Sequence, residues 1–269
     1  MSHHPVLIEA TELDRLRRSA TPPLIVHVGD ADGYARQHIP GAVFLDYADI
    51  NANAPPTAGL VPDSASLSQV LSALGVDGHR HVVAYDDHNG GRAGRLLYTL
   101  EIAGHPQARM LNGGLTAWCN AGLEVQREPV TPEPGDFRVQ WNDTPIATAD
   151  YILEHLDDDD VVLLDVRSLD EYHGTDRKAA RGGHIPGAVN MEWTLAIDED
   201  QRMRTDDDMR AQLEGLGVTP DREIIVYCQT HHRSAHTWAL LKAMGYPRVR
   251  GYPGAWSDWG NREDTPVEE

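Results

Sequence analysis

The chain has 269 residues, a length that suits two compact domains, each large enough to bury its own hydrophobic core. Its 42 acidic and 23 basic residues give a formal net charge of −19, so we expect neither nucleic acid nor an anionic membrane as a partner. No run of 18 apolar residues occurs, residues 1–5 do not begin a secretory signal, and two cysteines do not make a disulfide framework. These features favour a cytoplasmic location.

Taken in chain order, the predicted elements alternate between short β-branched strands and helices. Strands are predicted at residues 24–28, 81–85, 162–166 and 223–227. Helices are predicted at residues 64–74, 92–102, 209–216 and 234–244. This alternation indicates an α/β fold in which parallel sheets are covered by helices on both faces.

The second half of the chain repeats the first. The segment His-Ile-Pro-Gly-Ala-Val is identical at residues 38–43 and 184–189. Because the repeat unit is well over a hundred residues long, it indicates a domain duplication and not a solenoid. We expect domains at residues 1–126 and 143–269, joined by a linker at 127–142 whose prolines and charges favour an extended path.

A single cysteine stands where the predicted strand at 223–227 meets the helix that follows it. The loop at this junction reads Cys228, Gln229, Thr230, His231, His232, Arg233 and Ser234. Free backbone N–H groups in such a loop and the positive end of a helix dipole both favour the thiolate, which is the nucleophilic form. In the first half Asp86 occupies the matching position, and a carboxylate cannot act as a sulfur nucleophile. We therefore expect the chemistry in the second half alone.

Several of these features, in this order and duplicated, resemble the tandem-domain rhodaneses. They are the paired His-Ile-Pro-Gly-Ala segments, the cysteine loop, the strand end Asp165-Val166-Arg167, and the closing Gly-Tyr-Pro-Gly-Ala-Trp at residues 251–256. The cysteine loop is most similar to that of certain bacterial rhodaneses. It differs from the Arg-Lys-Gly loop of the thiosulfate type and from the Gly-Ser-Gly loop of the mercaptopyruvate type.

The resemblance implies two rhodanese-like domains, a non-catalytic one followed by a catalytic one. It implies a sulfurtransferase in which Cys228 takes a sulfane sulfur from thiosulfate, holds it as a persulfide, and passes it to cyanide or another thiophilic acceptor. No metal and no organic cofactor are implied. We expect a monomer whose partners are these small molecules.

The side chains of the loop suggest further roles. Arg233 could face the incoming sulfonate, or it could pair with carboxylates of its own domain and hold the loop shut. His231 and His232 can each donate a hydrogen bond and become charged near pH 6.5, so one could contact substrate while the other faces water. The rest of the cradle is expected from Gln229, Thr230 and Ser234.

Residues outside the loop are expected mainly to support it. Asp165 and Arg167 should brace the loop, His184 should be structural because His38 repeats it, and Cys119 should have no catalytic part. Glu171 is a departure, since the common rhodanese types have a substrate-binding arginine there. The positive charge that binds the substrate anion must therefore come from the loop itself. This disfavours mercaptopyruvate as a substrate and lowers the expected efficiency with thiosulfate.

Other functions remain open at this stage. A 3-mercaptopyruvate sulfurtransferase and a non-enzymatic rhodanese-type binding protein are the main alternatives. Dual-specificity phosphatases of the cell-division type share the fold but have five residues between cysteine and arginine, whereas four separate Cys228 from Arg233. Metal binding is not expected, because adjacent histidines rarely both reach one ion and the acidic runs at 157–160 and 206–208 suit a turn and a helix start.

Overall fold

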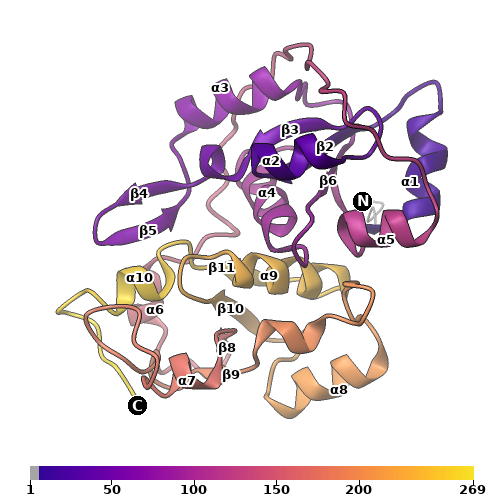
Figure 1. The fold of residues 1–269 in the computed structure, drawn as a ribbon. Coiled ribbons are helices and arrows are strands. Elements are labelled where there is room, and N and C mark those ends of the chain that lie inside the picture. Colours follow the sequence, from indigo (N-terminus) through magenta and orange to yellow (C-terminus); the bar gives the residue numbers. More distant parts are fainter. Residues whose placement is uncertain (1–5) are drawn as a thin grey trace. The chain divides into compact units, whose positions relative to one another are not determined.

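The computed structural model describes residues 6–269 and divides into two compact units (Figure 1). The first unit takes in the residues before Asn51, Pro62–Asp143 and Ile197–Met203, and the second takes in Asn51–Val61, Thr144–Ala196 and Arg204–Glu269. Two short segments thus belong to the unit built mainly from the other half of the sequence, an exchange that the repeats did not predict. The N-terminal residues 1–5, on which the signal-peptide prediction was made, lie outside the described residues.

The first unit contains a five-stranded sheet in the order β1-β7-β6-β2-β3, and every neighbouring pair is parallel. Its strands are β1 (Leu7–Ile8), β2 (Leu24–Gly29), β3 (Val43–Asp46), β6 (Val82–Tyr85) and β7 (Ala108–Leu111). Its helices are α1 (Ala10–Arg17), α2 (Ala31–Arg36), η1 (Tyr47–Ile50), α3 (Ser64–Leu74), α4 (Gly91–Ile102) and α5 (Gly114–Asn120). Side chains of α1 and α5 form one buried cluster with alternate residues of the sheet, such as Ile25 and Val83.

The second unit contains a four-stranded parallel sheet in the order β11-β10-β8-β9. Its strands are β8 (Val161–Asp165), β9 (Val189–Asn190), β10 (Glu223–Tyr227) and β11 (Val249–Gly251). Its helices are α6 (Ala149–Glu154), α7 (Leu169–Tyr172), η2 (Trp193–Ala196), α8 (Asp207–Gly215), α9 (Arg233–Ala243) and α10 (Ala255–Trp259). A two-stranded antiparallel hairpin, β4 (Ala52–Ala54) and β5 (Thr57–Leu60), also belongs to this unit.

The predicted strands and helices are confirmed, with shifts of one or two residues at their ends. The acidic run at 206–208 opens α8 as predicted, since the Asp206 carboxylate caps the helix by accepting from the backbone N–H of Met209. Residues 127–142 form neither helix nor strand and belong to the first unit, where the backbone N–H of Gln140 donates to the carbonyl of Ala103.

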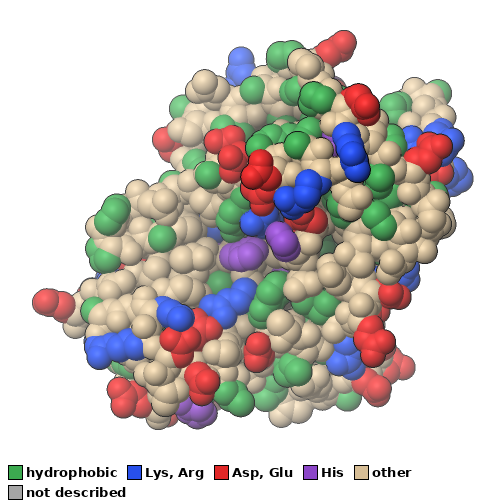
Figure 2. All heavy atoms as spheres, in the orientation of Figure 1, with side chains coloured by type: hydrophobic (Ala, Val, Ile, Leu, Met, Phe, Trp, Pro, Cys, Tyr) green, Lys and Arg blue, Asp and Glu red, His purple; other side chains and the backbone are tan. Residues whose placement is uncertain are grey.

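None of the helices in residues 6–269 combines the length and apolar character that crossing a bilayer requires. On the face drawn in Figure 2, acidic and basic side chains are interspersed and do not gather by sign.

The topology decides where chemistry can occur in the second unit. Tyr227 at the end of β10 lies opposite Asp165 at the end of β8, so the loops that follow both strands leave the same edge of the sheet. Ligands of open α/β sheets bind outside the carboxyl ends of the strands. The cysteine loop, residues 228–234, lies at this edge.

Candidate active site

The cysteine loop is held in place through its backbone. The Trp256 N–H donates to the carbonyl of Cys228 and the Ser257 N–H donates to the carbonyl of Gln229, each at 3.0 Å. The side chain of Gln229 also takes part, since its Nε2 donates to the carbonyl of Lys178 at 3.2 Å. The start of α10 therefore fixes the first two residues of the loop.

The sulfur of Cys228 is surrounded by groups that favour a negative charge. The side chain is 1% exposed, and burial by itself raises the pKa of the thiol. The Arg233 guanidinium, the Ser234 hydroxyl and the backbone N–H groups of Ser234 and Thr230 oppose this effect, so that the pKa of Cys228 lies below its ordinary value. The Ser234 hydroxyl lies 3.4 Å from Sγ. A thiolate held in this way is a nucleophile with its anionic form already stabilised.

Arg233 forms a bidentate ion pair with Glu171, with N–O distances of 2.6 and 2.8 Å. Of the two roles predicted for Arg233, the structure shows the pairing with a carboxylate of its own unit. Burial raises the pKa of Glu171, but the hydrogen bonds and charge of Arg233 bring it below the usual value. Glu171 is fixed in turn by Ser168, with which it forms the capping box of α7.

From the sequence, Glu171 was noted only because it stands where the common rhodanese types have an arginine. Its real contact, a guanidinium 62 residues further along the chain, was not predicted. The available signal was the Ser168-to-Glu171 spacing, which marks a helix start and so fixes the direction of the carboxylate.

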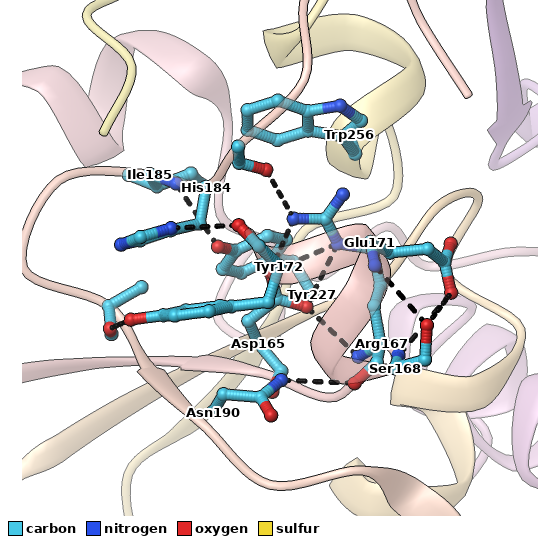
Figure 3. A network of polar contacts seen from close by, with 12 residues as sticks. Asp165, Arg167, Ser168, Glu171, Tyr172, His184, Ile185, Asn190, Tyr227 and Trp256 are labelled. Atoms are coloured by element: carbon cyan, nitrogen blue, oxygen red, sulfur yellow. Dashed lines mark hydrogen bonds and ion pairs between the residues drawn. The ribbon is translucent and has the colours of Figure 1, made fainter. Parts of the chain in front are cut away.

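Asp165 and Arg167 form a second, fully buried ion pair, in which Arg167 Nη2 lies 2.6 Å from Asp165 Oδ2 (Figure 3). Arg167 also donates to the carbonyl of Gly183 at 2.8 Å, and its guanidinium lies 4.5 Å from the centre of the Trp256 ring. The pair thus contacts the residue whose backbone N–H donates to the carbonyl of Cys228.

The duplicated histidines make equivalent contacts in the two units. His184 Nδ1 lies 2.9 Å from the Tyr172 carbonyl and its ring stacks on that tyrosine at 3.6 Å. In the first unit His38 lies 2.8 Å from the Tyr34 carbonyl and stacks on its ring at 3.8 Å. Contacts that recur in a unit without the cysteine support the structural role predicted for His184.

The two adjacent histidines of the loop have different surroundings. His231 is completely buried, in the left-handed backbone region at φ +53°, and its Nδ1 lies 2.8 Å from Ser234 Oγ. His232 is half-buried, with its ring centre 6.2 Å from that of Trp193. Of the two, only His232 is partly exposed.

The hairpin β4–β5 packs on the cysteine loop within the second unit. A Cβ added to Gly59 would lie 2.1 Å from the carbonyl oxygen of Thr230. The hairpin is fastened to α10, because the Ala58 N–H donates to Ser257 Oγ at 3.0 Å and Thr57 Oγ1 donates to Asp258 at 3.3 Å. Sequence reasoning missed this segment, since it lies in the first half of the chain and no periodic pattern links it to the loop.

In the first unit the corresponding loop encloses a carboxylate. Asp86 Oδ1 accepts from the backbone N–H groups of His88 and Gly90, and its Oδ2 accepts from that of Ala93, all at 2.9 Å. Glycines 29, 33 and 91 occupy the positions that match Arg167, Glu171 and Arg233. This cradle is filled by its own side chain. Cys119, the other cysteine, is an exposed free thiol at the end of α5.

Among residues 6–269, no three or more His, Cys, Asp or Glu side chains are grouped so that they could hold a metal ion.

The chain is similar to known proteins by family model, by sequence and by structure. The family model for the rhodanese-like domain matches residues 9–121 and 148–262. A thiosulfate sulfurtransferase of Azotobacter vinelandii is 44% identical over 264 residues, covering 98% of this chain and 97% of that protein, and one of Pseudomonas aeruginosa is 43% identical with the same coverage. A 3-mercaptopyruvate sulfurtransferase of Escherichia coli is 31% identical over 241 residues, covering 88% of this chain and 85% of that protein. Among solved structures, an anaerobic ergothioneine biosynthesis enzyme from Chlorobium limicola matches with a TM-score of 0.87 and 25% identity, over 98% of this chain and 70% of that one.

Proposed function

The chain belongs to the rhodanese family, with two rhodanese-like domains in tandem, and from that premise we propose that it is a thiosulfate sulfurtransferase acting through a persulfide on Cys228. The observation that carries the proposal is the set of donors around Sγ, which lowers the pKa of this buried thiol. Relatives of 43–44% identity over nearly the whole chain bear that name.

In the first half of the cycle, the Cys228 thiolate attacks the outer sulfur of thiosulfate. A bond forms between Sγ and that sulfur, the bond to the sulfonate sulfur breaks, and sulfite leaves with its electron pair. In the second half, cyanide or another thiophilic acceptor attacks the outer sulfur, and the thiolate is restored. The N–H groups that stabilise the thiolate are positioned to stabilise the persulfide anion as well.

The neighbouring residues have distinct roles in this proposal. Arg233 balances the charge on sulfur, while Glu171 holds the guanidinium in position. His232 is the histidine that faces incoming substrate, because its side chain is partly exposed. The backbone of residues 229–234 forms the cradle, and the buried pair of Asp165 and Arg167 supports it.

The catalytic domain in this proposal is residues 143–269, completed by the hairpin at 52–60. The domain at residues 1–126 is non-catalytic, because Asp86 provides no sulfur nucleophile. Residues 127–142 connect the two domains.

A second donor is favoured by one observation, the similarity to a 3-mercaptopyruvate sulfurtransferase. Against it, Glu171 brings a carboxylate towards the loop, where a mercaptopyruvate carboxylate would need a cation. Thiosulfate is therefore the donor we propose.

Intact mass after incubation with thiosulfate tests the function. The wild-type protein should gain about 32 Da, one sulfur atom, while Cys228→Ala should gain nothing. A parallel incubation with mercaptopyruvate ranks the two donors. No gain with either donor would refute the sulfurtransferase and favour a rhodanese-type binding protein.

A further inference from the structure

Three buried side chains form a continuous hydrogen-bonded chain that ends at the nucleophile. Ser234 Oγ lies 3.4 Å from Cys228 Sγ and 2.8 Å from His231 Nδ1. Cys228 is 1% exposed, and the other two are not exposed at all. Solvent is therefore not a ready acceptor for the proton of this thiol, whereas an imidazole is connected to it through a single hydroxyl.

The hydroxyl of Ser234 carries one proton, and this limits the chain to two arrangements. With a thiol, the S–H donates to Ser234 Oγ and the serine O–H donates to His231 Nδ1. With a thiolate, the serine O–H donates to sulfur and Nδ1–H donates to Ser234 Oγ. Conversion of the first into the second moves one proton from sulfur to the imidazole.

We propose that Ser234 and His231 form a proton relay that generates the Cys228 thiolate. In this step the S–H bond breaks and an O–H bond forms on Ser234, while the original serine O–H bond breaks and an N–H bond forms at Nδ1. The electron pair stays on sulfur, nothing is oxidised or reduced, and the product is a thiolate with an imidazolium. Ser234 touches the reacting sulfur, and His231 is a positioning residue that acts through it.

The first unit provides an internal comparison for this relay. The position that matches His231 is Asn89, which has nearly the same backbone conformation, with φ +60° against +53°. The position that matches Ser234 is Arg92. The backbone of the loop thus does not require a histidine, and both relay residues are absent from the loop that has a carboxylate in place of the thiol.

Other charged and titratable groups of the second unit lie on the elements that adjoin the cysteine loop. They are Glu171 from α7, Asp165 and Arg167 at the end of β8, Arg233, His232 and His236 from the loop and α9, and Asp258 from α10. Arg233 and Glu171 keep their charges through the neutral range, because pairing raises the pKa of the arginine and lowers that of the carboxyl. Burial lowers the pKa of His236 to about 3, so its ring stays neutral.

The pH dependence of alkylation by iodoacetamide tests the relay. Because Cys119 is an exposed free thiol, all variants should carry Cys119→Ser, and modification should be read on the peptide that contains Cys228. Ser234→Ala and His231→Asn should each raise the apparent pKa of Cys228 by about one unit, so that alkylation at pH values below the wild-type pKa falls about tenfold. The limiting rate in alkaline solution should stay at the wild-type value.

Two further variants separate a relay from a structural effect. Ser234→Thr keeps the hydroxyl and should restore the wild-type pH profile. The double variant Ser234→Ala/His231→Asn should shift the pKa no further than either single change, since both break one chain. An unshifted pKa in both single variants, or a loss of rate at every pH with the pKa unchanged, would overturn the relay.

The inference deepens the proposed function, because it concerns the same nucleophile. Alkylation needs no sulfur donor, so its outcome is independent of the persulfide experiment. A shifted pH profile without any gain of sulfur would retain the relay and reject the sulfurtransferase, and the converse result would reject the relay alone.

Discussion

Gly59→Ala should damage the site from a position in the first half of the sequence. The glycine has φ +75°, in the left-handed region, where an alanine costs about 1–2 kcal/mol. Its new Cβ would also lie 2.1 Å from the carbonyl oxygen and 2.8 Å from the carbonyl carbon of Thr230. Real Cβ contacts essentially never fall below 3.0 Å, so the hairpin and the loop must separate by about 1 Å in this closely packed region.

We expect Gly59→Ala to lower the rate of the reaction strongly, and not only the thermal stability. The backbone N–H of Thr230 is one of the donors to the Cys228 sulfur, so a displaced Thr230 weakens the cradle directly. A misplacement of about 1 Å costs on the order of 100-fold in rate. We expect the rate of persulfide formation from thiosulfate, followed by rapid quenching and intact mass, to fall by about that factor.

Gly245→Ala is the matched control. Gly245 has φ +87° and follows the end of α9, but its added Cβ would meet nothing within 4 Å. It therefore carries the conformational cost without the collision, and should lower the thermal stability while leaving the rate unchanged. Equal rates in Gly59→Ala, Gly245→Ala and the wild type would show that the hairpin does not constrain the loop.

Three other substitutions test the charges of the two units. Glu171→Gln should lower the free energy of unfolding by about 2 kcal/mol at neutral pH, because it replaces the carboxylate that pairs with Arg233 by a neutral amide. Because the pKa of Glu171 is lowered in the folded protein, this stabilisation is present above the pKa that Glu171 has in the unfolded chain, and it is lost as the pH falls through the pKa that Glu171 has in the folded protein. The free energies of unfolding of the variant and the wild type, measured by urea denaturation, should therefore converge in acid. A difference that stays constant with pH would contradict this. Arg167→Met should cost about 3–5 kcal/mol in the same assay by leaving Asp165 as an unpaired buried charge, and an unchanged midpoint would contradict it. Asp86→Cys, placed in the variant that lacks the second unit's nucleophile, should gain no sulfur from thiosulfate by intact mass, because the first unit has glycine where the second has Arg233; a gain of one sulfur would mean that the loop backbone alone suffices.

The sequence could predict what depends on local pattern and on repetition. Strands such as β8 and β10 are short apolar runs, and their duplication made the two α/β units visible without any structural information. The position of Cys228 followed from the same logic, since a residue between a buried strand and a helix must lie at the carboxyl edge of a parallel sheet.

Contacts between residues distant in the chain could not be predicted in this way. Arg233 pairs with Glu171 because α7 begins with a capping box that aims the carboxylate at the loop, and neither residue alone indicates the other. The hairpin at 52–60 was invisible for a similar reason, since its place beside Thr230 depends on the close approach that Gly59 allows. The two histidines looked equivalent in sequence, and only the left-handed backbone at His231 turns one of them inward.

The two loops together indicate what the fold supplies and what the side chains add. In each unit, backbone N–H groups of the loop converge on a negatively charged group. In the loop after β6 this group is the carboxylate of Asp86, and in the loop after β10 it is the sulfur of Cys228. The anion cradle is thus a property of the strand–loop–helix connection itself. Asp86 fills its cradle with a charge that needs no activation and leaves no place for a transferred sulfur. Reactivity in the second unit therefore depends on the few side chains that the first unit lacks at the matching loop positions, namely the thiol of Cys228, the guanidinium of Arg233 that balances it, and the hydroxyl and imidazole through which its proton can leave.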